Sequence, residues 1–283
     1  MPELSTALPD AMEFRKILKC FYVKQGIAVG DFRCKNQESC HKKVGRKDLC
    51  WGSEAHVGSQ YGTPFRIVIV SLDRGTGSDN IEDRSRAIEG LQEGNLNPHM
   101  KGTLQTLRAI LARPEPGTEV FRHFAMTNAA KCSYRQDGMT SVPDALYRNC
   151  SNYGKRELEA LKPHLIVTQG QRAIYALDGT GKQMEPSRAE ELTKKYLGAD
   201  ANRQELRQLI RDLLVTYVGS ATLNQGEAVW LRTPHPSARA GQWQHFAKFH
   251  LPILSAFVRD LAMGSRAICD CQGDTSRSKI GGR

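Results

Sequence analysis

The sequence predicts an α/β protein, built as a three-layer αβα sandwich around a central four-stranded, mainly parallel sheet. Two observations support this fold class: four short apolar runs have the composition of buried strands, and segments with helical periodicity lie between them. Strands that alternate with helices favour a parallel sheet covered by helices on both faces. In such sheets functional residues gather beyond the carboxyl ends of the strands, so the segments that follow the four runs are the first candidates for a site.

The four runs differ in how clearly they predict a strand. Residues 65–72, "FRIVIVSL", form a continuous apolar, β-branched run, which is typical of a strand buried on both faces. Residues 121–130, "FRHFAMTNAA", form a weaker second strand. Residues 164–170, "HLIVTQG", form a third that Gly170 closes, and residues 228–236, "AVWLRTPHP", form a fourth that ends at its prolines.

Helical patterns fill the intervals. Residues 102–111 and 154–162 carry leucines at helical spacing, and residues 243–262 predict a long apolar-faced closing helix interrupted near Pro252.

We expect one domain over residues 1–263. The highly charged stretch 180–215 predicts an inserted helical pair, and residues 264–283, rich in Gly, Ser and Arg, predict a flexible basic tail.

Charge and hydropathy narrow the class of protein. The net charge of +10 is compatible with a polyanionic partner such as nucleic acid. Mean hydropathy is −0.48, and no run approaches the roughly 18 apolar residues that cross a membrane. The first residues, "MPELSTALPDAMEFRKILKC", lack the apolar region of a signal peptide, so we expect a cytoplasmic protein without a membrane partner.

The eight cysteines are unevenly spaced. Cys34, Cys40 and Cys50 lie close together, and Cys132 and Cys150 form a second pair far downstream. Clustered cysteines in a cytosolic chain indicate a metal or iron–sulfur site rather than disulfides. None of these spacings is the C-x-x-C knuckle of common zinc folds, so spacing alone leaves zinc and iron–sulfur open.

Three motifs, each at an expected strand end, resemble the uracil-DNA glycosylase superfamily, specifically its iron–sulfur branches, families 4 and 5. "TNAAKC" (127–132), followed by a basic loop and the cysteine of "NC" at 150, is similar to the family's T-N-x-x-K-C strand end and second cysteine. "RELEALKPHLIVTQGQRAIYAL" (156–177) is similar to its helix–strand–helix segment, and "TPHPSA" (233–238) matches its H-P-S motif. The resemblance covers roughly residues 34–260 and implies that family's fold.

The resemblance implies a [4Fe–4S] cluster, with zinc as the alternative metal. Cys132 and Cys150 would supply half of its ligands, and Cys40 and Cys50 the other half, with Cys34 as the alternative to Cys40. In this role the cluster staples the basic loop to the N-terminal segment and needs no redox chemistry.

The resemblance also implies DNA as the partner, and no obligate protein partner is expected. The residues expected to contact DNA, five basic ones and a serine, lie in the loop between two cysteines, in the loop after the second strand and in the H-P-S segment: Lys42, Lys43, Lys131, Arg135, Ser237 and Arg239.

A DNA glycosylase must extrude its base, hold it by its edge and stabilise the positive sugar as the bond breaks. Asn128 is expected to bind the base, because an amide offers both a donor and an acceptor to a pyrimidine. His235 is expected to donate to the departing base. Asp73 is expected to orient water or stabilise the oxocarbenium ion, with Asp79 as the reserve.

The sequence departs from the family pattern around this site. Leu72 stands where family 4 carries its acid, and Arg74 replaces a proline. The family's base-stacking aromatic corresponds to His99 or Met100, and the loop before it, residues 76–97, is longer than in family 4.

These departures predict a remodelled pocket. Arg74, Asp79, Asn80 and His99 supply polar groups that suit a base with a polar substituent, such as the glucosylated hydroxymethylcytosine of viral DNA. Uracil remains the other candidate. The first hypothesis is therefore a monofunctional DNA glycosylase that leaves an abasic site. The alternative is a non-catalytic, metal-stapled nucleic-acid-binding protein that retains the fold.

Overall fold

The sheet of this computed structural model is mixed and has seven strands in the order β3-β5-β4-β6-β9-β8-β7. The residues that the structure describes are 10–44, 52, 54–73, 79–114, 116–132, 143–198, 203–238 and 241–272. The strands are β3 (His56–Val57), β4 (Ile67–Ser71), β5 (Phe124–Asn128), β6 (Leu165–Gln169), β7 (Gly181–Gln183), β8 (Val218–Leu223) and β9 (Gly226–Thr233). The predicted α/β class is confirmed.

The predicted number of strands was wrong. The four expected strands are β4, β5, β6 and β9, and they form the parallel centre of the sheet. Strand β3 adds to one edge and strands β8 and β7 to the other, all antiparallel to their neighbours. The second expected strand is also shorter than its apolar run, because Glu119–Arg122 form a 3₁₀ turn before β5.

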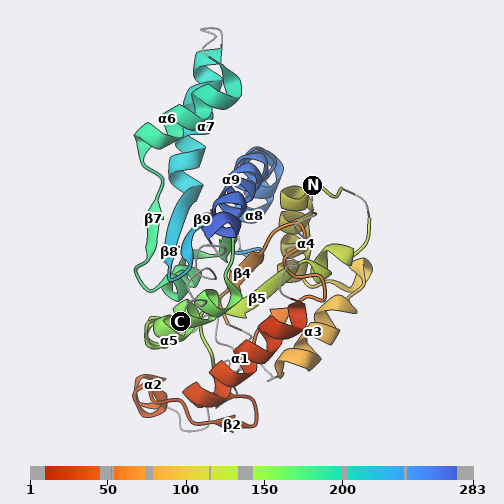
Figure 1. The fold of residues 1–283 in the computed structure, drawn as a ribbon, viewed down its shortest axis with the longest axis vertical. Helices are drawn as coiled ribbons and strands as arrows, with labels where there is room; N and C mark the ends of the chain where they lie inside the picture. The colour runs from red at the N-terminus through yellow and green to blue at the C-terminus, as the bar shows by residue number, and fades with distance from the viewer. Residues whose placement is uncertain are drawn as a thin grey trace, which may run out of the picture.

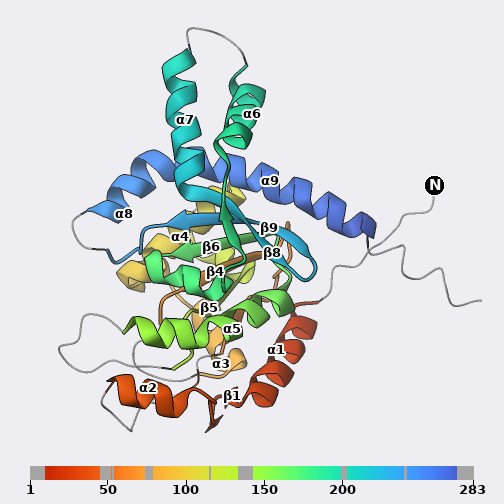
Figure 2. The same cartoon turned by 90° about the vertical axis from the view of Figure 1, so that its left-hand side faces the viewer.

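Two hydrophobic cores cover the two faces of the sheet. On one face Val68, Val70 and Ile166 pack with residues of α1 (Ala11–Gln25) and α5 (Asp144–Leu161). On the other face Ile67, Ile69 and Val167 pack with residues of the remaining large helices: α4 (Pro98–Leu111), α7 (Gln204–Tyr217) and α9 (Leu251–Gln272). Helices α5 and α9 accordingly lie on opposite sides of the sheet (Figure 2).

Helices α6 (Pro186–Leu197) and α7 form a hairpin that projects from the body of the protein (Figure 1). The base of α7 is anchored, because Ile210, Leu213 and Leu214 are buried in the core that α9 shares. The hairpin begins inside the stretch 180–215, which also contains β7, and ends two residues beyond it, at Tyr217.

The closing helical segment begins with α8 (Gln242–His245) and continues through a π-helical turn (Phe246–His250) into α9. Pro252 has no backbone N–H to donate, which accounts for the irregular turn just before it. Helix α9 runs to Gln272, beyond the expected domain limit at 263, and residues 273–283 of the expected tail lie outside the described residues. Within the described residues no helix has the length and apolar content needed to span a bilayer.

Candidate active site at the carboxyl edge of the sheet

Three neighbouring parallel strands end in polar, buried residues. Ser71 closes β4, Asn128 closes β5 and Gln169 closes β6, and Ser71 is directly paired with Asn128 in the strand register. Because these strands run parallel, their last residues share one edge of the sheet. The loops that carry Asp73 and His235 leave from the same edge, after β4 and β9. The topology therefore gathers the expected site residues where α/β proteins place their chemistry.

His99 belongs to a hydrogen-bonded cluster with two of these strand ends. Its Nε2 lies 2.8 Å from Oε1 of Gln169 and 3.1 Å from Oγ of Ser71. Gln169 is fully buried and also donates from Nε2 to Oγ1 of Thr103 at 3.0 Å. Since the amide oxygen of Gln169 only accepts, Nε2 of His99 carries the proton in this arrangement. Neither Gln169 nor Ser71 was expected in the site.

His99 is held neutral. Burial, with a smaller contribution from the adjacent His235, lowers the pKa of His99 to about 4. The two imidazole rings stack with their centroids 5.3 Å apart and their planes 20° apart. Of the two residues expected as the floor of a base pocket, His99 therefore lies beside the candidate catalytic histidine. Met100 is only 7% exposed and packs in the hydrophobic core, and its place in the base pocket stays a prediction.

His235 is oriented by its own loop. The backbone N–H of Ser237 donates to Nδ1 of His235 at 3.2 Å. In the neutral ring this bond leaves the proton on Nε2, which makes Nε2 a hydrogen-bond donor. Gly170, at φ +91°, lies against the histidine, and a Cβ at this position would be 3.1 Å from Cβ of His235. The close approach and the positive φ both explain why glycine follows β6.

Asn128 is fixed from behind by an arginine that sequence reasoning missed. Arg84, on α3 (Ile81–Glu89), is 6% exposed and donates from Nη2 to Oδ1 of Asn128 at 2.6 Å. Its other terminal nitrogen donates to the backbone carbonyl of Glu54. The Glu54 carboxylate accepts from the backbone N–H groups of Val29 and Ile81 at 3.0 and 2.9 Å. The amide is thus held by a chain of buried contacts that reaches the N-terminal segment.

Asp73 also has a buried partner. The hydroxyl of Tyr147, on α5, donates to Oδ2 of Asp73 at 3.2 Å. Tyr147 is 1% exposed, and burial together with the neighbouring Asp73 carboxylate raises the pKa of its hydroxyl. Its ring stacks on Tyr175 with centroids 6.4 Å apart, and the guanidinium of Arg172 lies 5.8 Å from the ring centroid. Asp73 is therefore a half-buried carboxylate oriented by a protonated phenol.

The expected base contact by Asn80 is corrected. Asn80 is the N-cap of α3: its Oδ1 accepts from the backbone N–H of Asp83 at 2.9 Å, and its Nδ2 donates to the Asp83 carboxylate at 2.8 Å. This capping role satisfies a backbone donor that the first turn of a helix otherwise leaves open. Asp79 is half-buried and immediately precedes the cap. Arg74 lies outside the described residues.

The expected DNA contact by Lys131 is also corrected. Lys131 is 1% exposed, and its ammonium group forms an ion pair with Glu157 and donates to Oγ1 of Thr127 at 2.7 Å. Glu157 in turn accepts from the hydroxyl of Tyr22 at 2.7 Å. This network joins β5, α5 and α1 in the interior, where a buried charge needs such a partner.

The other expected DNA contacts are dispersed. Lys42, on α2 (Gln37–Val44), is exposed and pairs with Glu38 at 2.7 Å, and Ser237 is exposed in the H-P-S loop. The side chain of Lys43, and Arg135 and Arg239 entirely, lie outside the described residues.

Four of the expected metal ligands are buried in the same core and form no disulfide: Cys34, Cys40, Cys132 and Cys150. Three sulfurs accept hydrogen bonds. The backbone N–H of Asn36 donates to Cys34 at 3.4 Å, Nδ2 of Asn149 to Cys40 at 3.2 Å, and the backbone N–H of Lys131 to Cys150 at 3.4 Å. Cys50 lies outside the described residues. Cys34 and Cys40 both contact α5, the helix that carries Cys150, through the Tyr153 hydroxyl at 3.6 Å and the Asn149 amide at 3.2 Å.

The chemistry of this donor set fits a thiolate-bound metal group. Hydrogen bonds to cysteine sulfurs are a recurrent feature of iron–sulfur sites, because they stabilise the charge on the ligands. Burial raises the pKa of Cys150 to about 12, and the thiols of Cys34 and Cys40 add to the rise. Within the described ranges, however, no three Cys, His, Asp or Glu side chains are arranged as a closed metal site.

The fold and the site define a class: an α/β protein with a mixed seven-stranded sheet, an acid–amide–imidazole set at the carboxyl edge and a buried cysteine cluster beside it. No protein-family model matches the chain, and no curated protein matches it.

Proposed function

We propose that this protein is a monofunctional DNA glycosylase, which extrudes a modified pyrimidine nucleotide and hydrolyses its N-glycosidic bond. One observation carries the proposal: Asp73, Asn128 and His235, a carboxylate, an amide and an imidazole donor, lie at or just after the carboxyl ends of three parallel strands, at the same edge of the sheet. These are the three kinds of group that base capture and glycosidic cleavage require.

The proposed division of labour follows from the partners of each residue. Asp73, positioned by the hydroxyl of Tyr147, faces the positive charge that develops on the sugar and orients the attacking water. Asn128, held by Arg84, binds the edge of the base. His235 donates from Nε2 to the negative charge on the leaving base. The bond between the sugar C1′ and the base nitrogen breaks, the water oxygen bonds to C1′, and the base leaves with a proton.

The neutral state of His99 suits this reaction. A cationic ring stacked on His235 would lower the proton affinity of its neighbour and repel a positive sugar. Burial keeps His99 uncharged near neutral pH, and Gln169 fixes its orientation. His99 is therefore proposed as a wall of the base pocket and as the group that orients His235.

A [4Fe–4S] cluster, with zinc as the alternative metal, is proposed to be held by Cys132, Cys150 and two of Cys34, Cys40 and Cys50. When bound, it supplies no chemistry to the base; it cross-links the N-terminal segment to the chain after β5. The hydrogen bonds that three of these sulfurs accept support this assignment. Iron and acid-labile sulfide in the purified protein would establish the cluster. Zinc without iron would instead establish a zinc site.

Two substrate classes remain in the proposal: uracil in DNA and a hypermodified cytosine such as the glucosylated base of viral DNA. The test is base release followed by mass spectrometry, with uracil-containing, hydroxymethylated and glucosylated DNA incubated separately. A released uracil indicates a repair enzyme, and a released glucosylated cytosine indicates a defence enzyme. Release must disappear in Asp73→Asn and His235→Ala while DNA binding persists.

A second candidate function is a DNA-binding protein without catalysis. One observation favours it: Leu72, which stands where the resembling family carries its acid, is an apolar side chain packed against the hydrophobic core and offers no carboxylate. DNA binding by a cluster-loaded protein that releases no base from any of the three DNAs would select this function.

A further inference from the structure

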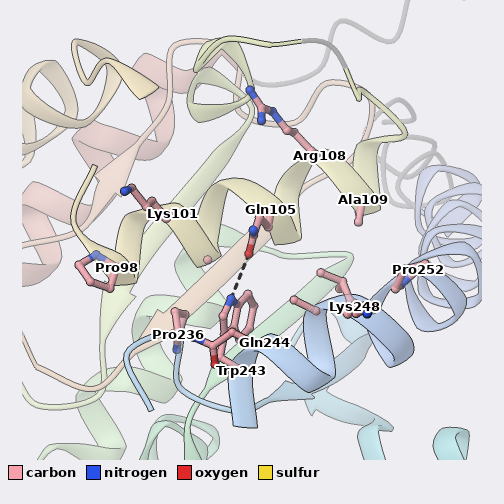
Figure 3. A pocket seen from close by; sticks show the side chains of 13 residues that line it. Pro98, Lys101, Gln105, Arg108, Ala109, Pro236, Trp243, Gln244, Lys248 and Pro252 are labelled. Carbon is pink, nitrogen blue, oxygen red and sulfur yellow. Dashed lines mark hydrogen bonds between the residues drawn. The ribbon is translucent and has the colours of Figure 1, made fainter. Parts of the chain in front are cut away.

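A groove of about 600 Å³ begins beside the candidate site and runs between α4 and the α8–α9 segment (Figure 3). Pro98 and Pro236 line its end nearest the site, and they are the chain neighbours of the stacked pair His99 and His235. The groove therefore begins one residue along the chain from each of the two stacked histidines. None of the residues proposed for catalysis, base binding or metal binding lines it.

The groove is a built feature of the fold. A Cβ on Gly102 of α4 would lie 2.4 Å from Cβ of Pro236 and 2.9 Å from the ring of Trp243, so only glycine allows this approach. Farther along, Nε1 of Trp243 donates to Oε1 of Gln105 at 3.0 Å, which joins the two walls (Figure 3). Trp243 is 5% exposed and forms the floor.

The charges around the groove have one sign. Lys101, Arg108 and Lys248 line it, and none of the lining residues is acidic. Arg108 is neutralised by two hydrogen bonds to the carboxylate of Glu93, at 2.8 and 2.6 Å. Lys101 and Lys248 are exposed and make no ion pair with another described residue. Two lysines on facing walls over an apolar floor match a chain of phosphates joined by less polar sugars.

We infer that this groove binds the phosphodiester backbone of one DNA strand, the strand that carries the extruded nucleotide. The assignment of the bound strand as the one that carries the extruded nucleotide rests on the proposed function, because the groove begins beside the proposed base-binding residues. Lys101 and Lys248 contact phosphates, and Gln105 and Gln244 add polar contacts along the walls.

The test compares the double variant Lys101→Gln/Lys248→Gln with the control Lys16→Gln/Lys24→Gln. The control removes the same charge from exposed positions on α1. Fluorescence anisotropy with an unmodified single-stranded oligonucleotide and its duplex gives Kd over a series of salt concentrations. For the single strand, the groove variant is expected to bind about tenfold more weakly than wild type at low salt. Its slope of log K against log salt is expected to be smaller by roughly 1.4, or 0.7 for each lost phosphate contact.

Equal losses in both double variants would overturn the inference, because they would report net charge alone. An unchanged Kd in the groove variant would also overturn it, even if the wild-type protein releases a base. A selective loss in the groove variant supports the groove even if no base is released, so failure of the groove and failure of the glycosylase are distinguishable.

Discussion

The carboxamide oxygen of Asn128 accepts a hydrogen bond from the guanidinium group of Arg84, at 2.6 Å. A guanidinium group only donates, so this contact fixes which end of the amide faces α3 and which faces away from it. Arg84 comes from a helix 44 residues earlier in the chain, and both side chains are buried. The orientation of the proposed base-binding amide is therefore set by a residue that need not touch the base.

The first prediction concerns this contact. Arg84→Met should lower the free energy of unfolding by about 1–3 kcal/mol, because it leaves the Asn128 oxygen and the Glu54 carbonyl without a buried donor. Base release should fall further than DNA binding. Urea unfolding and single-turnover release measure the two effects. The control is Arg86→Met, which removes an exposed ion pair of the same helix and should change neither quantity.

The sequence predicted the strands that have a clear local pattern and missed those that do not. Continuous apolar runs located β4, β5, β6 and β9, because strands buried on both faces need such residues. Strands β3 and β7 are too short for a pattern, and β8, "VGSATL", mixes small and polar residues.

For the site residues too, features with a local sequence pattern were predicted and features set by distant contacts were missed. The strand-end rule located Asp73, Asn128 and His235 as residues of one edge, although their roles stay predictions. It missed Gln169 and Arg84, whose partners lie far away in the sequence. It also assigned Lys131 to the surface, because nothing local reveals its pairing with Glu157 26 residues later.

The second prediction concerns the buried ion pair. Removing one partner, as in Glu157→Gln or Lys131→Met, should cost about 3–5 kcal/mol, because the other charge stays buried and unpaired. The double variant Lys131→Met/Glu157→Gln should cost clearly less than the sum, which a double-mutant cycle in urea measures. The exposed pair Glu38–Lys42 serves as the comparison, with a coupling of about 0.5 kcal/mol or less. Additive losses at Lys131 and Glu157 would contradict the assignment of Lys131 to the interior.

The third prediction concerns pH. Burial lowers the pKa of His99 to about 4 and that of His56 to about 3, below the usual 6.5. The unfolded chain therefore binds more protons than the folded protein between about pH 6.5 and those values, so stability should fall as pH falls through this window. Each histidine contributes a slope of up to about 1.4 kcal/mol per pH unit. His99→Gln should reduce the slope measured by urea unfolding and leave the part due to the other histidines with lowered pKa values, His56, His123 and His250. An unchanged slope would contradict the neutral state of His99.

The fourth prediction concerns Gly170, which has φ +91° and lies against His235. Gly170→Ala should destabilise the fold by about 1 kcal/mol through the positive φ and should also displace the imidazole. The matched control is Gly179→Ala, since Gly179 has φ +76° but a Cβ there would meet nothing within 4 Å. Both variants should lose stability, Gly170→Ala the more because its φ and ψ of 91° and 158° are open essentially to glycine and its Cβ would crowd His235. Only Gly170→Ala should lower base release. Equal release in the two variants would show that Gly170 does not position His235.

The central claim is that the acid, amide and imidazole at the carboxyl edge of the sheet form a glycosylase site. Its most direct test is single-turnover base release, by mass spectrometry, from uracil-containing and glucosylated DNA with wild-type protein and Asp73→Asn. Wild-type protein should release a free base and leave an abasic site in one of the two DNAs. Release by the variant should be at least about a hundredfold slower, on the scale of removing an electrostatic group from a reacting centre. Undiminished release by Asp73→Asn, or no release by wild-type protein that still binds both DNAs, would contradict it.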